Sequence, residues 1–312
     1  VSRAVDFRFC DLRSIFHHFG VPPPQIDQLI INYRSHQKIL ALSHQGVIRP
    51  LELAFPHAVD TLEADLGHRD GPRPIVVTDV RLEDLAEHLF NLDGSTGGIA
   101  FGASQCILVR NEAAKGALPT ELQRALVLTV EQSKGLEFDD VILVNFFGDS
   151  SYSEWQVMKN FRDDLLGLPE HAADEPRKRP HFERYRHTLL CSELKHLYTA
   201  MTRTKHVLLI IELDPRWAQS IFDLWGAMGL VSFGLLAPEN SDAIELLVSR
   251  AGESKGEDSW RAVALNLLQK QLFEQARSCF LRAQDESMAK VCEAYLTARR
   301  AAEAVTDSES DG

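Results

Sequence analysis

Short runs of consecutive apolar residues, separated by stretches with helical spacing, constrain this chain more than any other feature. The clearest runs lie at 105–109, 141–147 and 206–212. Consecutive apolar positions indicate strands that are covered on both faces, as in a parallel sheet. Alternation of strand and helix is typical of an open α/β layer. We therefore expect an α/β fold with a mainly parallel sheet.

The remaining elements follow from the same patterns. Three further strands are expected at 26–32, 74–78 and 125–130. Helical spacing covers 35–54, 82–92 and 193–204. Glycine and proline punctuate 63–74 and 171–180, which are expected to be loops.

Composition places the chain among ordinary globular proteins. It has 312 residues, 45% apolar and 25% charged side chains, and a net charge of −12. At about 150 residues per domain, the length predicts roughly two domains. We place them at 1–240 and 241–304, with a disordered acidic tail at 305–312. No uncharged stretch reaches the roughly 18 residues that a membrane span needs, so no membrane partner is expected.

Cysteine usage bears on the compartment. The five cysteines are odd in number, widely spaced and without a CxxC pair. This suits reduced thiols, so we expect an intracellular, reducing compartment, with nucleus and cytoplasm not distinguished. No Cys and His pairs have zinc-finger spacing, and no metal site is expected. The chain begins at Val1 without a leader, and we expect it to be a piece of a longer protein.

The last helical block carries a repeat pattern. Large and small apolar residues recur at the packing positions of one 34-residue tetratricopeptide unit. They are Trp260, Ala264, Leu267, Phe273, Ala276, Phe280 and Ala283. Any amphipathic helical hairpin would show a similar pattern, so both interpretations stay open. Such repeats normally need about three neighbours and would bind protein partners.

The densest polar signal is residues 129–143, a strand, a polar turn and a second strand. In the turn, Lys134 supplies a cation, Gly135 allows close backbone approach, and Glu137 offers two acceptor oxygens. Ligands of open α/β sheets bind at strand ends. A purely structural turn is an equal alternative.

Two further segments place arginines near strand ends. Arg203 follows a helix with small and hydroxyl-bearing residues, and Arg34 follows the aromatic Tyr33. A planar guanidinium suits phosphate oxygens, and Ser35 could cap the next helix. Taken singly, each arginine is more often a surface charge, and Tyr33 more often fills a core.

Together these segments resemble the UvrD/Rep-like superfamily 1 helicases. Residues 32–35 (NYRS) are similar to motif IV, 129–144 (TVEQSKGLEFDDVILV) to motif V and 197–205 (LYTAMTRTK) to motif VI, in the family's order. Residues 107–111 are similar to the strand and turn between motifs IV and V. The resemblance implies a second, C-terminal RecA-like lobe of a P-loop NTPase, the ATP-driven motor of a DNA or RNA helicase or translocase.

The resemblance also implies residue roles. Tyr33 would stack on adenine, Arg34 and Arg203 would act catalytically on the γ-phosphate, and Glu137 would accept from the ribose beside Gly135. ATP with Mg²⁺ is the implied cofactor, with the metal ligands on a first RecA-like lobe that is not in this chain. Thr129 and Lys134 would contact single-stranded DNA or RNA. No GxxxxGK[ST] occurs, so this chain alone is expected not to hydrolyse ATP.

Other features bear on nucleic-acid binding. Between positions 177 and 205 lie eight basic and two acidic residues, a local charge of +6, which could follow a phosphate backbone or be a solvated insertion. Trp155 could stack on unpaired bases with Tyr152, Phe146 and Phe147. Core packing is the safer interpretation for both phenylalanines.

Departures from the family leave a second hypothesis open. Close UvrD relatives carry a histidine at the position of Glu131. The helical block after motif VI is similar in arrangement to eukaryotic tetratricopeptide and ankyrin repeat-containing proteins with a UvrD-like core. The alternative is a non-catalytic, helicase-derived scaffold whose helical repeats mediate protein–protein interaction.

Overall fold

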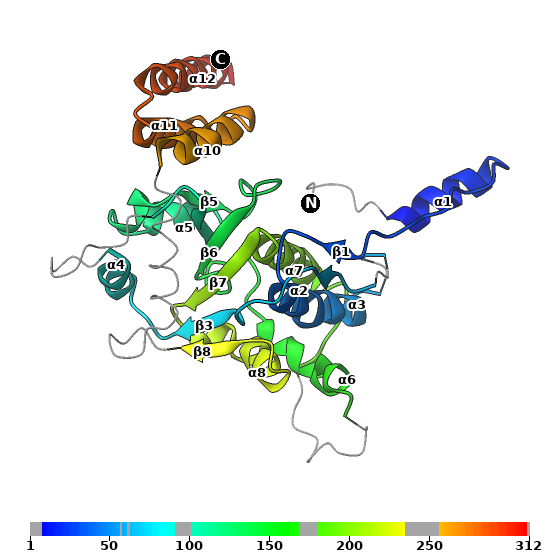
Figure 1. Ribbon diagram of the computed structural model, residues 1–312. Helices are drawn as coiled ribbons and strands as arrows, with labels where there is room; N and C mark the ends of the chain where they lie inside the picture. Colours follow the sequence, from blue (N-terminus) through cyan, green and yellow to red (C-terminus); the bar gives the residue numbers. More distant parts are fainter. Residues whose placement is uncertain are drawn as a thin grey trace.

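A computed structural model describes residues 8–56, 58–60, 63–90, 101–168, 180–234 and 256–310. Its centre is a sheet of six strands with helices on both faces (Figure 1). A stack of three helices stands beside the β5 side of this sheet, and the first helix, α1 (Phe9–His18), projects away and buries no residue. The chain is thus a mixed α/β protein with a helical segment at its carboxyl end.

The strand order of the main sheet is β5-β4-β6-β7-β3-β8, and every neighbouring pair is parallel. The strands are β3 (Ile75–Thr78), β4 (Gln105–Val109), β5 (Val127–Thr129), β6 (Phe138–Val144), β7 (Thr204–Glu212) and β8 (Ser232–Gly234). The parallel sheet that the apolar runs predict is therefore confirmed. A parallel pair of two-residue strands, β1 (Ile31–Asn32) and β2 (Leu66–Gly67), stands apart from it.

Side chains of the central strands alternate between two apolar cores. In β6, Val141 and Leu143 join the larger core, whereas Ile142 and Val144 join the smaller one on the opposite face. All four are at most 1% exposed. Because both faces are covered, the sequence of β6 is continuously apolar from Val141 to Val144.

The helices that precede the C-terminal segment, apart from α1, have the following bounds. They are α2 (Gln37–Ser43), α3 (Arg49–Ala54), α4 (Leu82–Phe90), α5 (Glu112–Ala117), α6 (Arg162–Leu166), α7 (Thr188–Met201) and α8 (Gln219–Ala227), with short 3-10 turns η2 (Leu122–Arg124), η3 (Trp155–Phe161) and η5 (Pro215–Trp217). A π-helical segment, η1 (His44–Ile48), joins α2 to α3, and the carbonyl oxygen of Gly46 accepts from Trp225 Nε1 at 2.9 Å. The predicted helix at 35–54 is therefore one continuous helical path that changes its hydrogen-bond pattern at a tight contact.

The predicted strands at 26–32 and 141–147 differ from the structure, and two short strands are not predicted. The strand expected at 26–32 is wrong except for β1, since Ile26 and Leu29 are exposed and do not join a sheet. The strand expected at 141–147 instead ends at Val144, because Asn145 turns the backbone with φ 48°. β2, which pairs with β1, and β8, at the edge of the main sheet, have no apolar run long enough to predict them.

The C-terminal helices are α10 (Glu257–Gln269), α11 (Phe273–Arg282) and α12 (Glu286–Ser310). Of the seven predicted packing positions, six are buried and Phe273 is half-buried, stacked on Tyr295 at 4.8 Å between ring centroids. The proposed boundary at 240 lies outside the described residues, so the domain limits stay predictions. The backbone of α12 is helical up to Ser310, which covers most of the acidic tail expected at 305–312.

No helix in the described part of the chain is long and apolar enough to cross a membrane.

A buried carboxyl group closes the carboxyl end of β7. Glu212 is 0% exposed, and its two oxygens accept from the backbone N–H groups of Phe147 and Gly148 at 3.1 and 2.8 Å. Burial raises the pKa of Glu212 to about 8, with Asp149 and Asp214 adding to the rise and the two N–H donors opposing it.

This raised pKa predicts a loss of stability with rising pH. A group whose folded pKa exceeds its unfolded value of 4.5 stabilises the fold fully below that value, and this contribution is lost as the pH rises through about 8. Urea unfolding from about pH 5 to about pH 9 should give a falling midpoint. Glu212→Gln should flatten this fall, whereas Glu87→Gln, at an exposed site on α4, should keep it. An equal slope in both variants would contradict the assignment.

Candidate functional site

The pairing of β6 with β7 brings two predicted site residues together. Glu137 directly precedes Phe138, and Arg203 directly precedes Thr204. Phe138 pairs with Thr204 in the parallel register, and the backbone N–H of Phe138 donates to the carbonyl oxygen of Arg203 at 2.8 Å. Both side chains therefore start at the amino-terminal edge of the sheet.

Arg34 reaches the same edge because its segment is tied to the start of β7. Ser35 Oγ donates to the carbonyl oxygen of Thr204 at 2.5 Å. Asn32 Oδ1 accepts from the backbone N–H groups of Arg34 and Ser35 at 2.9 and 3.1 Å. The side chain of an asparagine thus holds the turn that presents Arg34.

The expectation that Ser35 caps the following helix is wrong. The N-cap of α2 is His36, whose Nδ1 accepts from the backbone N–H of Lys38 at 3.2 Å. The other ring nitrogen of His36 lies 2.7 Å from the carbonyl oxygen of His206. Because the Ser35 hydroxyl is used on β7, the histidine takes over the capping role.

Glu137 is held between two cations. Arg34 Nε lies 2.6 Å from Glu137 Oε2, and Lys205 Nζ lies 2.9 Å from Oε1. The hydrogen bond from Lys205, followed by that from Arg34, lowers the pKa of Glu137 against the opposing effect of burial. The side chains of Arg34 and Glu137 are each 44% exposed, so this pair faces solvent. Lys205 is a site residue that the sequence reasoning did not single out, although it lies inside the motif VI-like segment.

Arg203 donates to three protein oxygens. Its Nε bonds the carbonyl oxygen of Thr199 at 3.0 Å, Nη1 that of Leu136 at 3.1 Å, and Nη2 the hydroxyl of Thr202 at 3.2 Å. Burial, followed by the charge of Arg34, lowers the pKa of Arg203. The two arginines are therefore close enough to repel each other, and they contact the consecutive residues Leu136 and Glu137.

Tyr33 presents an open aromatic ring beside this cluster. Its side chain is 68% exposed, and its ring centroid lies 5.1 Å from that of His68 with the planes tilted by 41°. A ring with this exposure can stack on a planar group. The interpretation of Tyr33 as core filler is wrong.

The turn at 130–137 connects two edges of the sheet. Thr129 ends β5 level with Val144 in β6 through their common partner Val109, whereas Glu137 precedes the start of β6. The turn therefore runs from the carboxyl-terminal edge to the amino-terminal edge. It carries Lys134, which is exposed.

Thr129 and Gly135 have clear local roles in this turn. Thr129 is 4% exposed, and its hydroxyl accepts from the backbone N–H of Gln132 at 3.2 Å while its own N–H donates to Gln132 Oε1 at 3.0 Å. Gly135 has φ +76°, which a glycine adopts without strain.

Trp155 is not available as a stacking surface, and that prediction is wrong. It is 0% exposed, with its ring centroid 4.9 Å from that of Phe147 and 5.3 Å from that of Tyr152. Phe146 and Phe147 are also buried, which confirms core packing for both. The sequence could not separate these roles, because a tryptophan suits both a core and a stacking surface.

Two cations of the basic stretch from 177 to 205 are paired within the protein. Residues 177–179 lie outside the described residues. Arg186 pairs with Glu154 at 3.1 Å, and Lys205 with Glu137. Carboxylates from other elements therefore neutralise these two cations.

A buried ion pair occupies the carboxyl-terminal edge. Arg110 Nε bonds Glu193 Oε2 at 2.7 Å, its Nη2 bonds the other oxygen, and Ser150 Oγ donates to Oε2 at 2.8 Å. Burial opposes ionisation, but Arg110, His196 and Ser150 lower the pKa of Glu193 to about 2. This network ties β4 to α7 and is satisfied by the protein itself.

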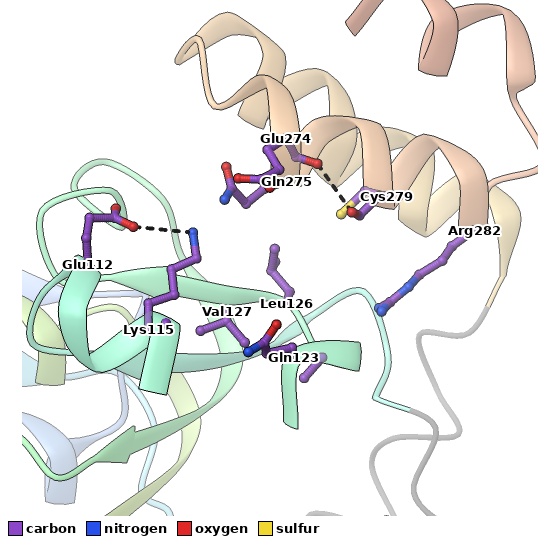
Figure 2. Close-up of a pocket in the computed structure, with 12 residues that line it drawn as sticks. Glu112, Lys115, Gln123, Leu126, Val127, Glu274, Gln275, Cys279 and Arg282 are labelled. Atoms are coloured by element: carbon purple, nitrogen blue, oxygen red, sulfur yellow. Dashed lines mark hydrogen bonds and ion pairs between the residues drawn. The ribbon is translucent and has the colours of Figure 1, made fainter. Parts of the chain in front are cut away.

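A pocket separates the helical segment from the sheet edge (Figure 2). Its walls come from α5 and β5 on one side and α11 on the other, and its volume is about 430 Å³. Lys115 points toward Glu112, with 3.9 Å between Nζ and Oε2, and Arg282 reaches down from α11. Tyr33, Arg34 and Arg203 of the candidate site do not line this pocket.

The site residues fit one part of a nucleotide site. An exposed ring, two guanidinium groups and a carboxylate lie at one edge, which suits a base, phosphates and a ribose hydroxyl. No group of three or more candidate metal ligands occurs among the residues that the structure describes.

The chain is similar to known proteins in sequence and in structure. No protein-family model matches the chain. Over 229 residues, 66% of this chain, it is 42% identical to the human TPR and ankyrin repeat-containing protein 1, and it spans 8% of that protein's length. The C-terminal domain of a possible DNA helicase from Lactobacillus plantarum WCFS1 is 17% identical, with a TM-score of 0.36, over 65% of this chain and 98% of that domain.

The position of Trp155 predicts its response to substitution. Trp155→Ala should lower the free energy of unfolding by about 3–5 kcal/mol, because it opens a large cavity among aromatic rings. Trp155→Phe should cost less, since the indole N–H has no hydrogen-bond partner in the described part of the chain. Trp217→Ala, at a 41% exposed position, is the control and should change stability by less than about 1 kcal/mol. Chemical denaturation measures all three, and a Trp155→Ala cost as small as the control's would contradict the core assignment.

Proposed function

We propose that this chain is the second, C-terminal RecA-like lobe of an ATP-dependent superfamily 1 helicase or translocase of the UvrD type. The observation that carries the proposal is the convergence of Arg34 and Arg203 on Leu136 and Glu137 at one edge of the sheet. These three segments are far apart in the sequence and match motifs IV, V and VI in order.

Phosphoryl transfer requires cations placed as these two arginines are in the proposal. Cations must stabilise the charge that develops on the transferred phosphoryl group, and an arginine finger contributes about 10³–10⁵ in rate. In the proposal Arg34 and Arg203 supply these cations to ATP, which a first lobe holds together with Mg²⁺. Tyr33 stacks on the adenine and Glu137 accepts from the ribose.

The present partners of the arginines are exchangeable. Glu137 neutralises Arg34 at a solvent-facing position, and a triphosphate can compete for this guanidinium with a higher charge. The three oxygens to which Arg203 donates are neutral, and a phosphate can replace them. Closure of a first lobe over this edge would therefore shift both arginines from protein acceptors to the nucleotide.

Single-stranded DNA or RNA is the proposed second ligand. Lys134 is exposed on the turn that starts at Thr129, and a cation there can meet a phosphate. With Trp155 buried, the proposed contact from this region rests on Lys134 and the turn backbone rather than on aromatic stacking. This turn ends at Glu137 in the proposed nucleotide site, which would link the two ligands.

The second candidate function is a non-catalytic scaffold whose helical repeats bind proteins. It is favoured by the contacts of Arg203 and Glu137, whose polar atoms are bonded within the chain, as in a purely structural cluster. The buried faces of α10 and α11 also fit a repeat unit. In this case nucleotide and nucleic acid would have no effect on the protein.

ATP hydrolysis separates the two candidates. We expect no turnover by this chain alone. In a longer protein that carries a phosphate-loop lobe upstream, nucleic-acid-stimulated turnover should fall by about 10³-fold or more for Arg203→Ala, and strongly for Arg34→Ala. Arg300→Ala, an exposed arginine on α12, is the matched control and should retain the activity. Turnover that survives both site substitutions, or turnover by this chain alone that Arg203→Ala abolishes, would contradict the proposal.

Oligonucleotide binding tests the second ligand on this chain itself. Lys134→Ala should weaken binding of a fluorescent single strand and reduce the slope of log affinity against log salt by about 1, because one phosphate contact is lost. Lys290→Ala removes the same charge from an exposed position on α12 and should leave the slope unchanged. Equal slopes for Lys134→Ala and the unaltered chain would exclude a phosphate contact at this turn.

A further inference from the structure

Lys270 links the C-terminal helices to the 130–137 turn, which carries Lys134 and ends at Glu137. It lies at the end of α10, where Gln271 with φ 60° leads the chain toward α11. Its Nζ donates to the backbone carbonyl oxygen of Lys134 at 2.7 Å. A hydrogen bond from a charged amine to a carbonyl oxygen is stronger than one between two neutral groups.

A second observation places the same amine against the next residue. A Cβ added to Gly135 would lie 2.8 Å from Lys270 Nζ, closer than real Cβ contacts allow. Gly135 therefore serves the turn in two ways, through its φ of +76° and through the space it leaves for Lys270.

The contacted turn is short and internally hydrogen-bonded. Within it, the N–H groups of Ser133, Lys134 and Leu136 donate to carbonyl oxygens of Thr129, Glu131 and Ser133 at 3.0, 3.2 and 2.9 Å. The carbonyl oxygen of Lys134 is the acceptor that Lys270 takes. Holding this oxygen restrains the middle of a turn whose two ends are Thr129 and Glu137.

The surroundings of this contact allow it to be made and broken. The helical segment and the sheet edge meet around the open pocket of Figure 2, which polar side chains from both parts line. Lys134 and Lys270 are both exposed, so the amine can exchange this carbonyl oxygen for water without disturbing the buried residues.

We propose that Lys270 is a positioning residue that holds the 130–137 turn through the Lys134 carbonyl and thereby lets the C-terminal helices set how this turn engages single-stranded nucleic acid. The restraint on the turn stands on the geometry alone. Its effect on nucleic acid rests on the proposed function.

Hydrogen exchange of the peptide covering 130–137 tests the restraint without any ligand. Lys270→Ala should speed exchange of the turn amides by about threefold to tenfold, the range expected for loss of one hydrogen bond. Lys270→Arg keeps a donor, so its turn amides should exchange at nearly the same rate as in the unaltered chain. Lys290→Ala is the matched control and should have no effect. Equal exchange in Lys270→Ala and the unaltered chain would overturn the proposal.

Gly135→Ala tests the same contact from the other side. The added methyl group should displace Lys270 and speed exchange of the turn, beyond the strain of a positive φ. In the Lys270→Ala background the added effect should be smaller, because the clash is already gone. Additive effects of the two substitutions would contradict direct contact.

Oligonucleotide binding then tests the effect on nucleic acid. With a fluorescent oligodeoxythymidine of about 20 nucleotides, Lys270→Ala should change the affinity by about threefold or more and leave the salt slope unchanged, because Lys270 bonds the turn and not a phosphate. If Lys270→Ala reduced the slope of log affinity against log salt by about 1, Lys270 would itself contact a phosphate, and its positioning role would be overturned. If the unaltered chain does not bind, the proposed nucleic-acid contact fails, and with it this effect of Lys270, while exchange still decides the restraint on the turn.

Discussion

The parallel pairing of β6 with β7 is the constraint on which the rest of the site depends. Its register sets Phe138 opposite Thr204, so the residues just before each strand, Glu137 and Arg203, meet at one edge. Ser35 bonds the first residue of β7 and carries Arg34 to the same place. Four apolar pairs, from Val141 with Leu208 to Val144 with Ile211, hold this register, because a slip by one residue would move their side chains to the opposite face. The arrangement of charges is thus fixed by a core that contains none of them.

The sheet separates two kinds of charged cluster. At the carboxyl-terminal edge, Arg110 and Glu193 are buried and paired, and the cluster needs no ligand. At the amino-terminal edge, Arg34 and Glu137 face solvent and can exchange partners. Ligands of open α/β sheets usually lie at the carboxyl ends of the strands. The solvent-facing cluster instead lies at the opposite edge, and the 130–137 turn spans the distance between the two.

The sequence predicts the parts of this structure that local patterns control. The strand at 105–109 agrees with β4, and the apolar runs correctly predict a sheet covered on both faces. The burial of Trp155 and the Lys205 and Lys270 contacts depend on residues distant in the chain, so no local pattern reveals them. Likewise β2 and β8 are too short to give a periodic signal, and they form because a neighbouring strand is already in place.

The central claim is that Arg34 and Arg203 leave their present acceptors for a nucleotide. The most direct test is an experimental structure of a longer protein, including a first lobe, with Mg²⁺ and a non-hydrolysable ATP analogue. We predict guanidinium nitrogens of both arginines at about 3 Å from γ-phosphate oxygens. An ordered nucleotide with Arg34 still on Glu137 and Arg203 still on Leu136 would contradict the account.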